Sequence, residues 1–327
     1  MIGGNRMGLT HLMTRSFLAH ALAAITLVIC PAYAQNWPLK PVRIITAEPG
    51  TGNDLIARLI VPYLSNAFGQ QFIVDNRGLV AVDMVAKAAP DGYTLLSYGP
   101  PLWLTPLLRQ VSYDPLRDLA PITLAGSSPN ILAIHPSVPA KSVSELLLLA
   151  KQRPGELNYS SSSTGSSPHL AAELFKSMAG INIVRVPYKG SSQALVGLVG
   201  GQVHLMFPNA GTVAPHLKST RVRALAVTTS APSALVPGLP TLSASGVTGY
   251  ESASQFALFA PAGTPSAIIE RLNREMIAAL RKPDVTERLF GSGVEVTTGT
   301  PAELAATMKS EMAKWGKLIK EAGIREE

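Results

Sequence analysis

A run of small, mostly hydroxylic residues, 160–167, lies near the middle of the chain and is called the serine loop below. A strand-like segment precedes it. Pro168 follows it, at a position that favours the start of a helix, with Ser167 as the expected N-cap. Hydroxyls and the open N–H groups of a helix N-terminus bind small anions such as carboxylates. The alternative is a flexible linker of low complexity, but the apolar helical pattern after Pro168 favours an anion site.

A second loop, residues 47–54, has the same design and is called the glycine loop. A β-branched run at 42–46 precedes it, Pro49, Gly50 and Gly52 interrupt it, and a helical pattern starts near Asp54. Asp54 is expected either to cap this helix or to orient a ligand. We predict that the two loops form opposite halves of one binding site.

Two other kinds of site have partial signals in the sequence, and a third has none. The glycine loop lacks the third glycine of a dinucleotide fingerprint, since Leu55 stands there, so no cofactor is expected. No His, Asp or Glu cluster has metal-ligand spacing, so no metal is expected. Ser192 follows a predicted strand in a distant likeness to a nucleophile elbow. A serine hydrolase of a small exported ester or amide is therefore kept as an alternative.

The first 34 residues read as a signal peptide. Arg6 and Arg15 precede an apolar run too short to span a bilayer, and a small-x-small site ends at Ala34. Cleavage there removes Cys30, the single cysteine, so the mature chain has no thiol. We expect an exported protein of the periplasm.

The remaining chain has 26 Lys and Arg against 21 Asp and Glu, a formal charge of +5. These charges are scattered singly and form no basic stripe with interleaved aromatics. Nucleic acid is not expected as a partner, and a monomer is expected.

Short apolar strands alternate with amphipathic helices along the mature chain, which predicts an α/β fold with mostly parallel sheets. The series of strand and helix units runs twice. Segments at 131–134 and 256–259, each followed by a proline, are predicted to cross between two lobes. We place lobe 1 at 36–133 plus 260–327 and lobe 2 at 134–259, with the ligand between them.

Several long motifs resemble one family, the substrate-binding proteins of tripartite tricarboxylate transporters, or Bug-type extracytoplasmic receptors. The motifs are Trp37-Pro38-x-Lys40-Pro41-Val42-Arg43-Ile44, Pro49-Gly50-x-x-x-Asp54-x-x-Ala57-Arg58, Ala86-Lys87-Ala88-Ala89-Pro90-Asp91-Gly92-Tyr93-Thr94-Leu95, Tyr113-Asp114-Pro115-x-x-Asp118, Ser166-Ser167-Pro168-His169-Leu170-Ala171-x-Glu173-Leu174-Phe175 and Val186-Pro187-Tyr188-Lys189-Gly190. The resemblance covers essentially the whole mature chain. It implies a two-lobed, periplasmic-binding-protein-like fold (type II) with two crossover connections, which closes on a small carboxylated solute.

The resemblance also implies a receptor that passes its solute to membrane transporter subunits and performs no catalysis. A receptor that presents its ligand to a sensor protein uses the same cleft and remains an alternative. Backbone amides, small side chains and waters of the two loops would hold the carboxylate. The expected ligand-binding residues are Ala47, Glu48, Pro49, Gly50, Thr51, Asn53, Asp54, Ser97, Ser162, Ser163, Thr164, Gly165, Ser166, Tyr188 and Asn209.

The glycine loop departs from the family pattern at three positions. Ala47 and Glu48 replace an aromatic and a small residue, and Thr51 replaces a glycine. A carboxylate at Glu48 inside the cleft would repel an anionic group or favour an amine. We therefore hypothesise a zwitterionic, amidic or aromatic solute; the alternative is that Glu48 points to solvent.

Overall fold

The computed structural model describes residues 37–325, so the predicted signal peptide and its cleavage site lie outside the described residues. The compact unit that begins at Lys40 holds both sheets and the site. Within residues 37–325, no helix combines the length and the apolar character that a membrane span requires.

The first sheet has five strands in the order β2-β1-β3-β10-β4. Its strands are β1 (Val42–Thr46), β2 (Phe72–Asn76), β3 (Thr94–Tyr98), β4 (Leu119–Pro129) and β10 (Ala253–Pro261). β1 pairs in parallel with β2 and β3, whereas β10 runs antiparallel to both β3 and β4. The β-branched residues of β1 are buried because helices cover the sheet.

The second sheet repeats this plan in the order β7-β6-β8-β5-β9. Its strands are β5 (Ile131–Ile134), β6 (Asn158–Ser161), β7 (Val184–Pro187), β8 (Leu205–Met206) and β9 (Arg223–Val227). β6 is parallel to β7 and β8, and β5 is antiparallel to β8 and β9. In each sheet, four strands share one direction, and the strand that enters from the other lobe opposes them. The predicted two-lobed α/β fold is confirmed.

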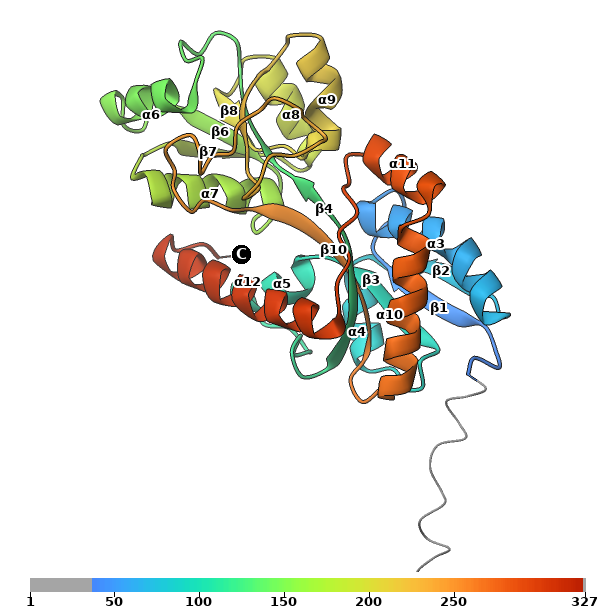
Figure 1. Ribbon diagram of the computed structural model, residues 1–327. Helices are drawn as coiled ribbons and strands as arrows, with labels where there is room; N and C mark the ends of the chain where they lie inside the picture. The colour runs from blue at the N-terminus through green and yellow to red at the C-terminus, as the bar shows by residue number, and fades with distance from the viewer. Residues whose placement is uncertain (1–36, 326–327) are drawn as a thin grey trace, which may run out of the picture. The chain divides into compact units, whose positions relative to one another are not determined.

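The chain crosses between the lobes twice, and the two crossings lie side by side. β4 leads into β5 through Asn130, and β10 returns along β4 with Ala253 paired to Pro129. Figure 1 shows these two long strands, green and orange, running together from one group of elements to the other. The crossings therefore fall a few residues before the predicted segments: β5 belongs to the second sheet and β10 to the first.

Strand β4 is the longest strand, and the sequence patterns did not predict it. It contains two prolines, a glycine and two serines, residues that usually indicate a turn. Pairing with β10 along its whole length holds these residues in an extended conformation. Long-range pairing thus overrides local preference here.

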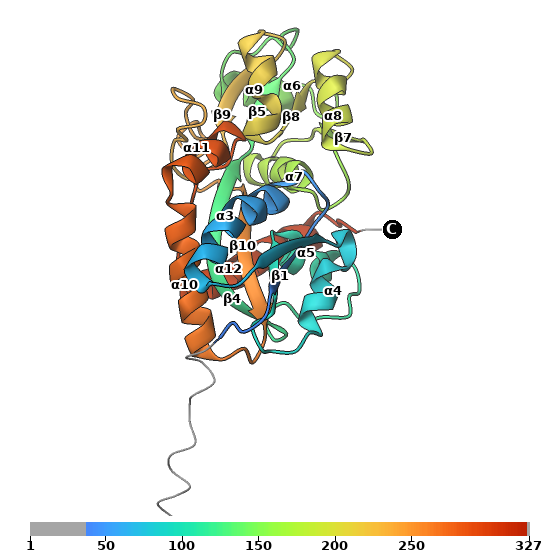
Figure 2. The same cartoon turned by 90° about the vertical axis from the view of Figure 1, so that its right-hand side faces the viewer.

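Helices cover both faces of the first sheet. They are α3 (Gly52–Phe68), α4 (Ala81–Ala86), α5 (Pro101–Leu108), α10 (Ser266–Leu280), α11 (Pro283–Gly291) and α12 (Pro301–Glu321), with a 3₁₀ turn η1 at Gly78–Val80. Figure 2 shows α3 and α10 together on one side of the strands and α4 and α5 on the other. Ile45 and Leu96 are buried with Trp103 of α5 and Trp315 of α12 in one apolar cluster.

The second lobe carries α6 (Val143–Gln152), α7 (Ser167–Ala179), α8 (Ser191–Val199) and α9 (Ala210–Lys218). The two predicted helix starts, near Asp54 and at Pro168, lie two residues and one residue after the observed starts of α3 and α7. The cap of α7 is Ser166 instead of Ser167, and the cap of α3 is Thr51 instead of Asp54. At α12, Thr300 and Glu303 form a full capping box, whereas at α6 Ser142 caps the N–H of Glu145 without the reciprocal bond.

Candidate ligand-binding site

A cavity of about 880 Å³ lies between the two lobes. This size falls within the usual range for sites that bind small molecules. Its walls come from loops at the carboxyl ends of the parallel strands in both sheets and from β10, which joins the lobes. Such crevices at strand ends are the usual ligand positions in open α/β sheets.

Five helices have their N-termini in the wall of this cavity: α3 and α5 in the first lobe, and α7, α8 and α9 in the second. Residues at or just before each helix start line it, among them Thr51, Ser166, Gly190 and Asn209. Each helix N-terminus carries a partial positive charge and unpaired N–H groups. An arrangement of this kind favours a negatively charged ligand.

The glycine loop supplies the first-lobe wall. Thr51 accepts a hydrogen bond from the N–H of Asp54 and so caps α3. Gly50 has a φ of +79°, a conformation that other residues rarely adopt, and its N–H donates to Asp54 Oδ2. The N–H groups of Gly52 and Asn53 have no hydrogen-bond partner among the described residues, so they remain open to a ligand.

Asp54 is held inside the first lobe by three donors. Burial alone raises the pKa of its carboxyl, but hydrogen bonds from Arg58, the Gly50 N–H and Asn76 outweigh burial and lower it. The Asp54–Arg58 distance is 2.9 Å and the Asp54–Asn76 distance is also 2.9 Å. Asp54 therefore shapes the glycine loop from behind and does not line the cavity.

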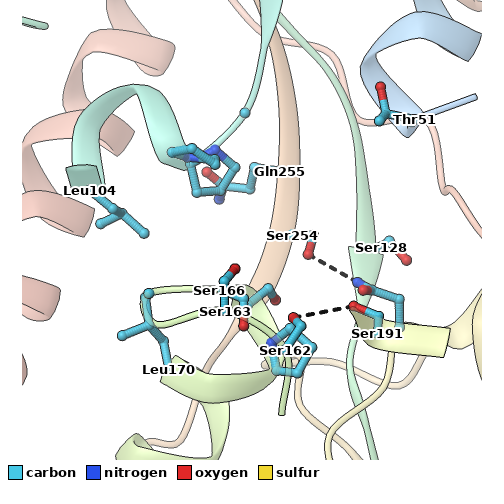
Figure 3. Close-up of a pocket in the computed structure, with 18 of the residues that line it drawn as sticks. Thr51, Leu104, Ser128, Ser162, Ser163, Ser166, Leu170, Ser191, Ser254 and Gln255 are labelled. Carbon is cyan, nitrogen blue, oxygen red and sulfur yellow. Dashed lines mark hydrogen bonds between the residues drawn. The ribbon is translucent and has the colours of Figure 1, made fainter. Parts of the chain in front are cut away.

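The serine loop supplies the opposite wall, where Ser162 to Ser166 line the cavity. Figure 3 shows Ser162, Ser163 and Ser166 grouped on this side, with Ser162 accepting a hydrogen bond from Ser191 of α8 at 3.3 Å. Ser166 Oγ is buried and has no hydrogen-bond partner in the described structure.

Two residues behind the serine loop hold its conformation. Arg185 of β7 donates to Ser161 Oγ at 2.8 Å, to Thr164 Oγ1 at 3.1 Å and to the Ser162 carbonyl at 2.9 Å. His169 Nδ1 accepts from the Gly165 N–H at 3.0 Å. Burial, and then the nearby charge of Arg185, lower the pKa of His169 to about 4, so its ring is neutral at pH 7. Neither residue was among the predicted site residues.

The crossing strands form the back of the cavity. Asn209, at the start of α9, donates to Ser254 Oγ of β10 at 3.0 Å, a bond drawn in Figure 3. Ser254 pairs with Ser128 of β4, and both residues line the cavity. The Oε1 atom of Gln255 and the Oδ1 atom of Asn53 are buried without a hydrogen-bond partner among the described residues.

The cavity also has an apolar side and a few charges. Figure 3 shows Leu104 and Leu170 from the two lobes on the same side of the site, and Phe256, Val294 and Trp315 add further apolar surface. Its charged lining residues are Glu48, Arg109, Lys189 and Glu311. Glu311 is bound to Lys314 and to the indole N–H of Trp315 at 2.6 Å, so its charge is largely engaged.

Glu48 is an exposed residue that contributes to the cavity wall. Its Oε1 atom is 2.7 Å from the position where a Cβ on Gly78 would lie. The neighbouring hydroxyl of Tyr98 has a raised pKa, caused first by burial and then by the charge of Glu48. The carboxylate therefore lies beside Gly78 and Tyr98, two residues that do not line the cavity.

Of the predicted residues, ten line the cavity: Glu48, Gly50, Thr51, Asn53, Ser162, Ser163, Thr164, Gly165, Ser166 and Asn209. The other five are placed elsewhere: Ala47, Pro49, Asp54, Ser97 and Tyr188. Ser97 is buried and donates to the Asn53 carbonyl at 3.0 Å. Tyr188 donates to Gln202 at 3.2 Å. These two side chains turn toward neighbouring backbone and side chains because their polar groups find partners there.

Lining residues of β4, α5 and β10 were not predicted from the sequence, among them Ser128, Leu104, Ser254, Gln255 and Phe256. These residues are far apart along the chain, and no local motif marks them. The one available signal was the predicted crossing at 256–259, because crossing strands pass the cleft in two-lobed proteins.

The alternative sites find little support. Ser192 is exposed and lies outside the cavity wall. His135, His169 and His204 are engaged with Ser137, Gly165 and Asn158, respectively. Across residues 37–325, no group of three or more His, Cys, Asp or Glu side chains is placed to hold a metal ion.

Comparison with known proteins decides the family. The profile of the tripartite tricarboxylate transporter family receptors, TctC, matches residues 56–324. The chain belongs to this receptor family. The protein from the tcbD-tcbE intergenic region of Pseudomonas sp. strain P51 is 37% identical to this receptor over 292 residues, which is 87% of each chain. Protein BugT of Bordetella pertussis is 33% identical, with 98% of this receptor and 99% of BugT covered.

Solved structures agree with this assignment. Rpa4515 of R. palustris, solved with adipate, is 40% identical to the receptor at a TM-score of 0.75, covering 88% of this chain and 99% of the other. MatC from Rhodopseudomonas palustris, solved with malate, is 28% identical at a TM-score of 0.70, covering 86% and 100%. The family is one of solute receptors and not of enzymes, so the hydrolase alternative built on Ser192 is not retained.

Proposed function

We propose that this receptor captures a small carboxylate-bearing organic solute between its lobes and delivers it, unchanged, to a tripartite membrane transporter. The convergence of five helix N-termini on one cavity carries this proposal, because open N–H groups and helix dipoles stabilise a carboxylate without a fixed cation. The adipate and malate of related structures belong to the same chemical class. Closure of the two lobes on the solute is the functional event.

Binding is tested by thermal shift and calorimetry with adipate, malate and the uncharged dimethyl ester of adipate. A solute that binds only the folded protein raises the melting temperature as ln(1 + [L]/Kd). We expect at least one carboxylate to raise it and the ester to leave it unchanged.

The site is tested with Ser163→Asp, which places a negative charge in the cavity wall. Two like charges about 5 Å apart repel by roughly 3 kcal/mol at an effective dielectric constant of 20, so affinity should fall at least tenfold. Ser192→Asp is the matched control, since it makes the same change at an exposed position of the same lobe. Equal affinities of the two variants would contradict the proposed site.

We further infer that the receptor is periplasmic and monomeric. The predicted export signal and the periplasmic assignment of BugD support the location. N-terminal sequencing of the exported protein should begin at Gln35, and light scattering should give the mass of one chain. Loss of solute uptake on deletion of the gene would favour delivery to a transporter over presentation to a sensor.

A further inference from the structure

A second, smaller cavity of about 270 Å³ adjoins the serine loop. Its walls come from the serine loop, from α7, from β7 and from the segment that follows α12, which runs beneath α7 in Figure 1. Thr164 lines both this second cavity and the ligand cavity between the lobes. The serine loop therefore forms the wall that separates the two cavities.

Positive charge exceeds negative charge in the second cavity. Lys176, Arg185 and Arg325 line it, and Glu173 is the one acidic residue in its described wall. Both carboxylate oxygens of Glu173 accept hydrogen bonds from Lys176, at 2.8 and 2.9 Å, so these two charges compensate each other. Neither Arg185 nor Arg325 is paired with a carboxylate in the described part of the chain. Two guanidinium charges thus remain without an anion.

Arg185 has donors to spare for such an anion. An arginine side chain has five N–H donors, and Arg185 gives three of them to Ser161, Ser162 and Thr164. The remaining two have no partner among the described residues. Guanidinium groups bind anionic oxygens through donors of this kind, and charges taken out of water are usually paired. An anion in the second cavity would bind Arg185 without drawing it away from the serine loop.

His169 adds an uncharged donor to the same cavity. It lines the second cavity and is only 3% exposed. Its Nδ1 accepts the hydrogen bond from the Gly165 N–H, so the hydrogen of the neutral ring is on Nε2. Nε2 has no hydrogen-bond partner among the described residues, and it is not closed off from solvent. Since polar groups on side chains this deeply buried are usually hydrogen-bonded, this N–H lacks an acceptor that an anion would supply.

We propose that the second cavity is a separate anion site, which takes a tetrahedral oxyanion such as inorganic phosphate. Its donors come from β7, from α7 and from the segment after α12, and donors on several sides suit four oxygens better than the two of a carboxylate. The bound oxyanion fixes the guanidinium of Arg185, and Arg185 fixes the serine loop. Occupancy of the second cavity therefore orders one wall of the ligand cavity.

Calorimetry with inorganic phosphate and the mature receptor tests the site, at constant ionic strength and with chloride as the reference anion. We expect saturable binding of one phosphate per chain. Arg325→Gln should weaken it about fivefold, because it removes one charge at an exposed position of the wall. Arg221→Gln, at an exposed position of the same lobe, is the matched control and should preserve the affinity. Absence of saturable binding at millimolar phosphate, or equal affinities of the two variants, overturns the inference.

Another variant shows which cavity the phosphate occupies, since the helix N-termini of the ligand cavity also attract anions. Thr212→Asp places a negative charge in the wall of the ligand cavity alone, in the first turn of α9, where an acidic residue suits a helix. The phosphate affinity should stay unchanged. A larger loss with Thr212→Asp than with Arg325→Gln would place the phosphate in the ligand cavity and overturn the inference.

The carboxylates of Glu326 and Glu327, which follow Arg325 in the sequence, are the competing anions. A double variant, Glu326→Gln with Glu327→Gln, tests them. Phosphate should bind the wild type as well as this variant. Binding to the double variant alone would mean that the chain's own carboxylates occupy the second cavity, and the inference would fall.

Hydrogen exchange measures the effect on the serine loop and requires no solute. Saturating phosphate should slow the exchange of the amide hydrogens of residues 162–166 about fivefold in the wild type, and it should have no effect in Arg185→Met. Unchanged exchange in the wild type would overturn the link between the two cavities. Because these measurements use phosphate alone, failure of carboxylate binding would refute the proposed function and leave this inference standing.

Discussion

At the scale of single residues, the site depends on side chains that never reach the ligand cavity. Asp54 is 5% exposed at its side chain and takes hydrogen bonds from Arg58, Asn76 and the Gly50 N–H. A charged acceptor with several donors is one of the stronger local arrangements in a protein. Its role is to hold the glycine loop in shape, and this differs from the expected contact with the ligand.

Asp54→Asn should lower the free energy of unfolding by about 1–3 kcal/mol at pH 7, because it weakens three hydrogen bonds to a buried carboxylate. The folded-state pKa of Asp54 is lowered. Its stabilisation is therefore fully present above the unfolded pKa of about 4 and is lost as the pH falls through the folded pKa. Urea unfolding at a series of pH values measures this effect.

The difference between the wild type and Asp54→Asn should shrink as the pH falls below about 4. Asp91→Asn, at a carboxylate 45% exposed and 3.9 Å from Lys40, is the control and should cost less than about 1 kcal/mol at any pH. A constant penalty for Asp54→Asn at all pH values would show that its charge is not what stabilises the loop.

At the scale of elements, the serine loop is a rigid part of the second lobe. Arg185 on β7 donates to three residues of the loop, Ser161, Ser162 and Thr164, through one guanidinium group. His169 on α7 accepts a hydrogen bond from the Gly165 N–H. The planar fork of arginine fixes the directions of its bonds, which a lysine cannot reproduce. Strand β7 and helix α7 thereby set the positions of the loop N–H groups and hydroxyls before a ligand arrives.

Arg185→Met should weaken carboxylate binding by about tenfold, because a loosened loop must be ordered again when the ligand binds. Arg185→Lys should recover only part of the affinity. Calorimetry measures the affinity, and a melting curve in the absence of ligand measures the stability of the fold.

Arg223→Met is the matched control, since Arg223 donates to the Ala140 carbonyl at 2.8 Å in the same lobe. It should lower the melting temperature without changing the affinity. Wild-type affinity in Arg185→Met would mean that the serine loop keeps its conformation without this residue.

At the scale of the whole binding unit, the two lobes meet at a pair of glycines as well as at the crossing strands. Gly211 of α9 lies against the segment after α11: a Cβ on Gly211 would be 2.5 Å from the Ser292 carbonyl oxygen. Gly293 has a φ of +80°, and a Cβ there would be 2.4 Å from the Gly211 N–H nitrogen. The approach of the lobes on this side of the cavity therefore requires residues without side chains.

Gly211→Ala should hold the lobes apart and weaken solute binding, with little change in the stability of either lobe. Small-angle scattering at saturating ligand should show a larger radius of gyration than for the wild type. Gly291→Ala is the control, because its added Cβ meets no atom within 4 Å and its φ is not positive. Equal radii and affinities for Gly211→Ala and the wild type would contradict a closing role for this contact.

The sequence by itself determined the fold class, the family and the two loops that face each other across the cavity. These features have local signals: β-branched runs, glycine and proline breaks, and hydroxylic helix caps act over a few residues. The segments around Pro49 and before Pro168 therefore hold nine of the ten predicted residues that line the cavity, and Asn209 is the tenth.

Only the tertiary structure decided the rest. Strand β4 forms against its local preference because β10 pairs along it, and that pairing brings Ser128 beside Ser254 and places Gln255 in the cavity wall. Long-range hydrogen bonds likewise hold Asp54 and Ser97 inside the first lobe, since Asn76 donates to Asp54 and Ser97 donates to the Asn53 carbonyl. The direction of a side chain depends on partners distant in the chain, and this is information that a local pattern does not contain.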